Sequence, residues 1–224
     1  MANLRFCFII IMENLNQLKN LLSTPKDIVI FSHRNPDGDA LGSSLGLAHF
    51  LSAQHHSVRI ILPSEYPNYL NWMVGVEDIV IYDLVPEHAK LAIEKADIFF
   101  CLDFNSLDRI DKCGDLMMKQ TAPKVVIDHH LFPENFADFI LSDTTASSTS
   151  ELIFDFIHLL DQSKYLVPAT ADALYVGIVS DTGSFLYNTS SKVFRITATL
   201  LDRGVDDVSI QNRLHNNLEI KQLK

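Results

Sequence analysis

The chain has 224 residues and a hydrophobic content of 47%, which is enough to bury the core of one large α/β domain and excludes an intrinsically disordered protein. Its formal net charge of -10 argues against a broad basic surface that would bind nucleic acid by neutralising phosphates. The three cysteines are widely spaced and form no Cys-x-x-Cys pair, which supports neither a disulfide framework nor a zinc knuckle and indicates a reducing, cytoplasmic environment.

An apolar run at residues 6–12 begins the chain. It is too short to span a bilayer, and no small-residue cleavage site follows it, so we expect neither a membrane partner nor a signal peptide. Residues 1–12 are therefore either a buried edge strand or an upstream extension, and we favour the extension because Met12 could itself start a chain. A packing helix is predicted next, at residues 13–22, where leucines recur at helical spacing.

Apolar runs and amphipathic segments then alternate along the chain. Strands are predicted at residues 27–33, 58–62, 78–82, 97–103, 124–128 and 139–141. Helices are predicted at residues 40–54, 86–95, 108–118, 148–160, 169–179 and 190–202, and a further polar helical pattern begins at residue 206. Residues 63–75 are interpreted as a packed irregular loop rather than one wall of a cleft. The alternation predicts an α/β fold with a doubly wound, mostly parallel sheet flanked by helices.

One imidazole and two carboxylates, those of His33, Asp37 and Asp39, follow the first of these strands. Pro36 and Gly38 suit a tight turn, which would let the three side chains converge above the end of the strand. Imidazole nitrogen and carboxylate oxygen suit Mn, Mg or Fe better than a metal bound by thiolates. The ordinary alternative is that His33 and Asp39 cap the next helix and that Asp37 fills a turn.

Two further strands also end in ionisable residues. Asp103 ends one, and Asp128, His129 and His130 end the other. Ligands bind beyond the carboxyl ends of the strands in an open α/β sheet, so the fold would bring these clusters to one rim. Asp181 adds a carboxylate whose place cannot be assigned from spacing alone. Four converging carboxylates would repel one another unless cations were bound, and two divalent ions would balance their charge.

The four segments resemble the signature motifs of the DHH phosphoesterase superfamily, which are His-x-x-x-Asp-x-Asp, Leu-Asp, Asp-His-His and Ser-Asp-Thr-Gly. Their order and spacing are similar to the branch that holds RecJ-like exonucleases, nanoRNA-degrading oligoribonucleases with pAp phosphatase activity, and cyclic-di-AMP phosphodiesterases. The resemblance covers about residues 13–204. It implies a hydrolase of phosphate esters that uses two divalent metal ions, commonly Mn2+, with Mg2+ as the alternative.

The resemblance also implies a role for each residue of the motifs. The two metal ions would be held by His33 and Asp37 on one side and by Asp39, His129 and Asp181 on the other. Asp103 would bridge both ions. His130 would face the scissile phosphate as a donor or general acid, and Asp128 would orient the imidazole pair from behind.

Members of this branch usually continue into a second domain with a glycine-rich substrate-binding motif. The eight glycines of this chain never occur side by side, and the stretch after residue 204 is too short for such a domain. We therefore expect residues 13–204 to form the DHH catalytic domain and residues 205–224 to begin an inter-domain linker helix. The C-terminal substrate-binding domain is expected to be absent from this sequence, which is either an isolated catalytic domain or one cut short in the inter-domain helix.

The expected function is hydrolysis of short oligoribonucleotides or pAp-like nucleotides by attack of a metal-bridging hydroxide. Arg34 and Asn35, inside the first motif, could touch a phosphate or only form the turn. Ser147, Ser148 and Thr149 could bind phosphate, but Ser148 also begins a helix capping box. The substrate partner is thus a short RNA or a nucleotide, and a homodimer stays open.

Other functions compete with this one. A family II inorganic pyrophosphatase or exopolyphosphatase would share the metal motifs and differ chiefly in its second domain. A non-catalytic nucleotide or metal sensor would keep the fold, but it would be favoured by loss of a ligand, and none is missing. A haloacid-dehalogenase phosphatase is disfavoured because His33, rather than the first Asp, ends the strand.

Overall fold

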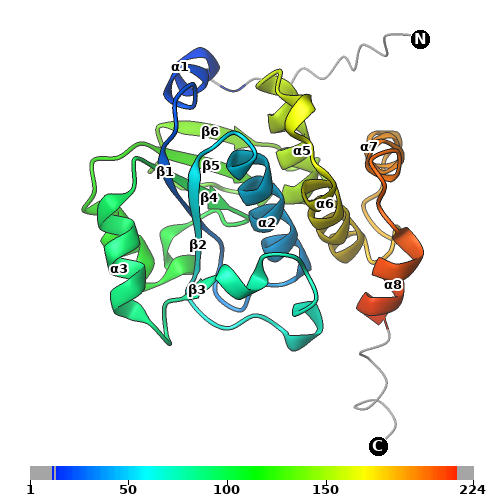
Figure 1. Cartoon of the computed structure of the whole chain (residues 1–224), viewed down its shortest axis with the longest axis horizontal. Coiled ribbons are helices and arrows are strands. Elements are labelled where there is room, and N and C mark those ends of the chain that lie inside the picture. Colours follow the sequence, from blue (N-terminus) through cyan, green and yellow to red (C-terminus); the bar gives the residue numbers. More distant parts are fainter. Residues whose placement is uncertain (1–11, 13, 216–224) are drawn as a thin grey trace, which may run out of the picture.

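The centre of the molecule is one six-stranded sheet. The computed structural model describes Met12 and residues 14–215 of the chain. The strands are hydrogen-bonded in the order β3-β2-β1-β4-β5-β6, and every neighbouring pair is parallel (Figure 1). Their bounds are β1 (Asp27–Phe31), β2 (Ser57–Leu62), β3 (Val80–Ile81), β4 (Ile98–Leu102), β5 (Lys124–Asp128) and β6 (Phe139–Ser142). The predicted doubly wound parallel sheet is therefore confirmed.

Helices cover both faces of this sheet. The helix bounds are α1 (Leu15–Leu21), α2 (Gly38–Ser52), α3 (Pro86–Lys95), α4 (Lys112–Met118), α5 (Thr149–Leu159), α6 (Pro168–Asp181), α7 (Ser191–Leu201) and α8 (Asp207–His215). Short 3-10 helices lie in the connections, namely η1 (Asn68–Leu70), η2 (Val76–Asp78), η3 (Leu107–Ile110) and η4 (Ser163–Tyr165). α2, α5 and α6 pack on one side of the sheet, and α3 and α4 pack on the other (Figure 1).

Side chains of the central strands alternate between two hydrophobic clusters. In β1, Ile28 and Ile30 belong to the cluster on the α2 side, whereas Val29 and Phe31 belong to the cluster on the α3 side. All four are buried because helices cover both faces of the parallel sheet. The interiors of β1, β4 and β5 are therefore continuous apolar runs, and polar residues follow where each of these runs ends.

Glycines bring α2 and α6 close together. A Cβ atom placed on Gly42 would lie 2.6 Å from the carbonyl oxygen of Ala173 and 2.6 Å from the backbone nitrogen of Gly177. A Cβ atom on Gly38 would overlap the side chain of Ser180. Because real Cβ atoms do not approach backbone atoms so closely, glycine is needed at these positions. The amino end of α2 thus lies directly against the carboxyl end of α6.

Most predicted elements differ from the observed ones by one or two residues at an end, and three differences bear on the fold or the site. The helix expected at residues 108–118 is split into η3 and α4, because Asp111 between them has a positive φ of 47°. The strand expected at residues 78–82 is limited to β3, since η2 occupies its start. The helix expected at residues 169–179 continues to Asp181. The strand and the last helix differ at their ends, whereas the first helix is broken in its interior and begins as a 3-10 helix.

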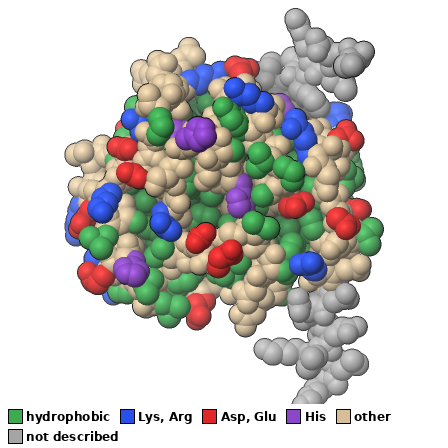
Figure 2. All heavy atoms as spheres, viewed as in Figure 1, with side chains coloured by type: hydrophobic (Ala, Val, Ile, Leu, Met, Phe, Trp, Pro, Cys, Tyr) green, Lys and Arg blue, Asp and Glu red, His purple; other side chains and the backbone are tan. Residues whose placement is uncertain are grey.

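Some expectations concern residues outside the described part of the chain. The extension proposed for residues 1–12 lies outside it except for Met12, and so does the end of the proposed linker helix, residues 216–224. No described helix combines the length and apolar character needed to cross a bilayer. Figure 2 shows acidic and basic side chains interspersed over the visible face, as the net charge led us to expect in place of one basic patch.

Candidate metal centre

The order of the sheet reverses between β1 and β4, and polar residues gather at this switch point. His33 follows β1, and Asp103 follows β4 with a positive φ of 64°. His129 follows β5. Asp39 lies in the first turn of α2, and Asp181 is the last residue of α6. The crevice beyond the carboxyl ends of the strands at such a switch point is the usual ligand site of this architecture.

Side chains from these segments meet in three overlapping groups, and within each group the possible ligand atoms lie within 4.8 Å of one another. The groups are His33, Asp37 and Asp103; Asp39, His129 and Asp181; and Asp103, His129 and His130. All six residues predicted as metal ligands are thus brought together. Asp103 is shared: its Oδ2 lies 3.4 Å from Nε2 of His33, and its Oδ1 lies 3.5 Å from Nε2 of His129. This central place is what a bridging ligand would require.

Burial and mutual repulsion raise the pKa of two of these carboxyl groups. Asp39 is fully buried, and burial, followed by the charges of Asp103 and Asp181, holds its pKa well above its usual range. Burial and the charges of Asp103 and Asp37 raise the pKa of Asp181 to about 7. Asp181 also ends a helix, where the partial negative charge of the helix dipole disfavours a carboxylate. A positive charge close to these carboxylates would therefore stabilise the arrangement.

The pKa values of His33 and His129 are raised as well, which favours the charged form of each imidazole. Burial opposes the charge on His129, but the hydrogen bond with Asp103 and the nearby carboxylates outweigh it and raise its pKa to about 9. The pKa of His33 is also raised, because contacts with Asp103 and the carbonyl of Arg34 outweigh its burial. Burial likewise opposes ionisation of Asp103, yet His129 and His33 hold the pKa of this carboxyl below its usual range.

Because the pKa values of Asp39, Asp181, His33 and His129 are all raised, protons would offset part of the negative charge of the cluster. A divalent cation would take their place, because carboxylate and imidazole ligands release protons when they bind a metal. The donors are oxygen and nitrogen atoms only, which suits Mn2+ or Mg2+ better than a metal that prefers thiolates. The residues present therefore fit a pair of hard divalent ions.

His130 and Asp128 form a pair beside this cluster. Asp128 is fully buried and lies 2.7 Å, through its Oδ1, from Nδ1 of His130. Its Oδ2 accepts the backbone N–H of the same histidine at 3.2 Å. Nδ1 of His130 is 3.9 Å from Oδ1 of Asp103. The pair has the geometry of a carboxylate that sets the orientation of an imidazole.

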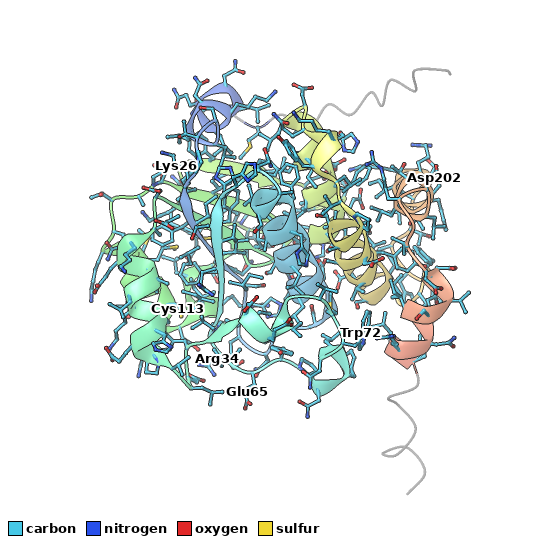
Figure 3. The ribbon with its side chains drawn as sticks, in the orientation of Figure 1. Lys26, Arg34, Glu65, Trp72, Cys113 and Asp202 are labelled. Atoms are coloured by element: carbon cyan, nitrogen blue, oxygen red, sulfur yellow. The ribbon has the colours of Figure 1, made fainter. Side chains whose placement is uncertain are left out.

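Arg34 and Asn35, proposed as substrate contacts, have other partners. The guanidinium of Arg34 binds both carboxylate oxygens of Asp83, at 2.8 and 3.2 Å, and also pairs with Asp111. Figure 3 shows Arg34 at the end of the sheet where α2 begins. Asn35 has a positive φ of 52°, and its backbone N–H donates to Oγ of Ser64 at 2.8 Å. These contacts favour the turn role that the sequence leaves open for both residues.

The segment at the start of α5 is buried rather than open to a substrate. Ser147, Ser148 and Thr149 are 2%, 0% and 0% exposed. Ser148 caps the helix by accepting the N–H of Glu151, and the hydroxyl of Ser147 donates to Oε2 of Glu151. The N–H of Thr149 donates to Oδ2 of Asp39 at 2.6 Å. Burial disfavours direct contact of these side chains with phosphate.

Two residues beside the candidate metal centre were not found from the sequence. A cavity of about 330 Å³ is lined by Asp37 and Asp181 together with Tyr69 and His215. His215 is tied to Ser184 by a 2.7 Å contact between Nε2 and Oγ. The expectation of a packed loop at residues 63–75 was wrong for Tyr69, which contributes to a wall of this cavity. The run of prolines and aromatic residues there was the available signal.

Comparisons with known proteins bear on the family and the fold of the chain. The family described as DHH family, N-terminal domain, matches residues 27–178. A probable bifunctional oligoribonuclease and PAP phosphatase of Streptococcus mutans is 31% identical over 84% of this chain and 56% of its own length. The crystal structure of an exopolyphosphatase-related protein from Bacteroides fragilis has a TM-score of 0.88 and 40% identity, over 90% of this chain and 60% of that one.

A more distant structure, that of exonuclease RecJ bound to manganese, shares the fold with a TM-score of 0.53 at 18% identity, over 86% of this chain and 48% of that one. The chain thus spans about half the length of these three proteins.

Proposed function

Because the chain belongs to the DHH family, we propose that it is a metal-dependent phosphoesterase that hydrolyses short oligoribonucleotides or pAp-like nucleotides. The observation that carries this proposal is the meeting of three overlapping ligand groups, two of which share Asp103, at the switch point of the sheet. Carboxylates crowded into a buried site destabilise one another unless cations neutralise them. Paired divalent ions held in this way are the usual machinery of phosphoryl displacement.

The residues suggest how two ions would be held. One ion would be bound by His33 and Asp37, and the other by Asp39, His129 and Asp181, with Asp103 contributing to both. Mn2+ is the proposed metal and Mg2+ the alternative. When bound, such ions neutralise charge on a phosphoryl oxygen and make water a stronger nucleophile.

His130 is the proposed proton donor. Its Nδ1 is engaged by the buried Asp128, which leaves Nε2 as the ring nitrogen that can reach a substrate. The side chain of His130 is 35% exposed, whereas that of Asp128 is fully buried. A protonated Nε2 would donate to the leaving oxygen of the phosphate ester, and Asp128 would stabilise the charged imidazole.

Two substrate classes have support from relatives. The Streptococcus mutans relative is named for oligoribonuclease and PAP phosphatase activity, which supports oligoribonucleotides and pAp. The Bacteroides fragilis structure, at 40% identity, is described as exopolyphosphatase-related, which supports pyrophosphate or polyphosphate as the second candidate. Because the chain spans about half of these proteins, the choice between the two classes is part of the proposal.

A hydrolysis panel tests the proposal. The purified chain is supplied with Mn(II) and, in separate reactions, with an RNA dinucleotide, pAp, pApA, pyrophosphate or polyphosphate. Release of mononucleotide or phosphate from the first three supports the proposed function. Turnover of pyrophosphate or polyphosphate alone would establish the second candidate instead. Bound Mn(II) without any turnover would contradict an enzymatic role and favour a sensor.

The Asp103→Asn variant is the control for this panel. Asparagine retains the size of the side chain but removes the charge, and like aspartate it tolerates a positive φ. We expect the variant to lose Mn-dependent hydrolysis of every substrate that the unmodified chain cleaves. Full activity in the variant would show that the reaction does not depend on the cluster around Asp103.

A further inference from the structure

Thr149 touches two of the candidate metal ligands at once. Its backbone N–H donates to Oδ2 of Asp39 at 2.6 Å, and its hydroxyl donates to Oδ1 of Asp103 at 3.0 Å. The next residue, Ser150, donates its N–H to Oδ1 of Asp39 at 2.9 Å. Both oxygens of Asp39 are therefore held by the first turn of α5. The two carboxylates come from different elements, Asp39 from α2 and Asp103 from the end of β4, and both accept hydrogen bonds from Thr149.

We propose that Thr149 is a positioning residue that, with the first turn of α5, orients Asp39 and Asp103 toward the two metal ions. The proposal rests on the proposed function, because it assigns Thr149 a role at that same metal centre. It replaces the idea, open from the sequence, that Thr149 contacts the substrate. Each carboxylate oxygen can accept more than one hydrogen bond or metal contact, so these bonds leave lone pairs for cations.

Helix capping alone does not account for these contacts. The side-chain cap of α5 is already supplied by Ser148, whose Oγ accepts the N–H of Glu151 at 3.1 Å. The bond from the Thr149 hydroxyl to Asp103 satisfies no backbone group of the helix. This bond therefore satisfies the carboxylate of Asp103 rather than the helix. A buried carboxylate needs hydrogen-bond donors, and fixed donors also fix its direction.

A buried network holds this first turn in place. Glu151 accepts the N–H and the hydroxyl of Ser147 through Oε2, both at 2.8 Å. Its other oxygen, Oε1, lies 2.8 Å from Nζ of Lys192 on α7. Lys192 also pairs with Asp155, which lies one turn further along α5, at 2.6 Å. The turn that carries Thr149 is thus fixed from the side opposite the carboxylates.

The space around Asp39 leaves little freedom for another arrangement. A Cβ atom on Gly177 of α6 would lie 2.6 Å from Oδ1 of Asp39 and would overlap the side chain of Ser150. Asp39 is therefore confined between the backbone of α6 and the first turn of α5. Loss of the Thr149 hydroxyl would remove a 3.0 Å hydrogen bond from Oδ1 of Asp103, which then keeps the longer 3.5 Å contact with Nε2 of His129.

The experiment compares three single variants of the full chain. Thr149→Val removes the hydroxyl but retains the shape and the backbone N–H, and Thr149→Ser restores the hydroxyl. Thr170→Val is the matched control, because Thr170 is also fully buried and its hydroxyl has no hydrogen-bond partner among the described residues. Binding of Mn(II) is measured by titration calorimetry, and thermal unfolding without metal shows that each variant is folded.

We expect Thr149→Val to weaken Mn(II) binding by about 10- to 100-fold, the range found when residues behind metal ligands are replaced. Thr149→Ser and Thr170→Val should bind Mn(II) as the unmodified chain does. Equal affinity in folded Thr149→Val and the unmodified chain would overturn the proposal. If Thr149→Val does not fold, Thr149→Ala replaces it, and equal affinity of the Ala and Ser variants would likewise overturn it.

The outcome is separable from that of the proposed function. If the unmodified chain binds no Mn(II), the metal-dependent phosphoesterase itself is contradicted. If the unmodified chain binds Mn(II) and only the Thr149 comparison fails, the phosphoesterase stands and the positioning role is lost. Calorimetry needs no turnover, so neither result depends on the choice of substrate.

Discussion

The imidazole of His130 lies 2.7 Å from the fully buried carboxylate of Asp128, measured from Nδ1 to Oδ1. A second bond, from the backbone N–H of His130 to Oδ2, fixes the same carboxylate. The two contacts hold the ring in one orientation and direct its Nε2 away from Asp128. Asp128 thus orients the imidazole of His130, and it is not one of the residues proposed to hold the cations.

We therefore predict that Asp128→Asn lowers kcat more than it lowers metal affinity. An amide in place of the carboxylate no longer stabilises a charged imidazole, and the expected loss in kcat is about 10- to 100-fold. Steady-state kinetics with Mn(II), together with calorimetry, measure the two effects. Asp161→Asn, at an exposed position far along the chain, is the control. A variant that loses metal affinity but not kcat would contradict the proposed role.

The second prediction is that Mn(II) binding releases protons and strengthens as pH rises. Near pH 7, His129 with a pKa of about 9 carries a proton, and Asp181 with a pKa of about 7 is about half protonated. Raised pKa values mean that protons compete with the cation until pH exceeds them, so affinity should increase between pH 6 and about 9. Calorimetry in buffers of different ionisation enthalpy counts the protons. A dissociation constant that is constant over this range would contradict the assignment of these ligands.

The third prediction concerns the contact between α2 and α6. Gly42→Ala would place a Cβ atom 2.6 Å from backbone atoms of Ala173 and Gly177, which cannot move aside as a flexible side chain would. We expect a loss of about 1–3 kcal/mol in the free energy of unfolding, as overpacking of a dense interior usually costs. Urea denaturation measures it, with Ser52→Ala on the exposed side of the same helix as control.

The same variant should also bind Mn(II) less tightly, because the contact places Asp39 next to Asp181. Unchanged stability of Gly42→Ala would show that the two helices can separate without cost. Unchanged metal affinity in a destabilised variant would show that the ligands do not depend on this contact.

The fourth prediction concerns the buried ion pairs of Lys192. The side chains of Glu151 and Asp155 are each 3% exposed, so Lys192→Met would leave two buried carboxylates without their cation. Removal of one partner from a buried pair costs about 3–5 kcal/mol of stability. Lys19→Met is the control, because its partner Asp161 is 85% exposed and such pairs contribute about 0–1 kcal/mol.

The loss from Lys192→Met should depend on pH in a defined direction. Burial raises the pKa of Asp155 to about 6 even though Lys192 opposes the rise. Protonated carboxyl groups need no cation, so the difference in stability between variant and unmodified chain should be smaller at pH 5 than at pH 8. Denaturation curves at the two pH values decide this. A larger deficit at pH 5 would contradict the explanation.

Much of the sheet could be predicted because helices cover both of its faces. β4 is apolar throughout and the interiors of β1 and β5 are apolar, so the carboxyl end of each strand was marked by the first polar or ionisable residue after the apolar run, as at Asp103. Those same ends carry the candidate ligands, which is why most of the site followed from the strands. The break at Asp111 could not be predicted in this way. A residue with a positive φ between η3 and α4 leaves the helical spacing of the apolar residues almost unchanged.

The remaining parts of the site depend on contacts between segments far apart in the chain. Asp181 reaches the cluster because glycines let α6 approach α2, and spacing along the sequence does not reveal such an approach. Thr149 joins Asp39 and Asp103 through bonds that span 110 and 46 residues. The sequence drew attention to Thr149 as a polar residue before a helix, but its partners became apparent only in three dimensions.

The positive φ of Asp103 limits which residues can stand at the centre of the site. Asparagine and aspartate adopt this conformation at low cost, whereas β-branched and bulky residues do not. A mutagenesis library at this position would therefore mix two kinds of failure, loss of a ligand and backbone strain, in most variants other than asparagine and glycine. Anyone redesigning the centre for another metal would do better to vary Asp181 at the end of α6, where the backbone is helical and the side chain is 24% exposed rather than confined as that of Asp39 is.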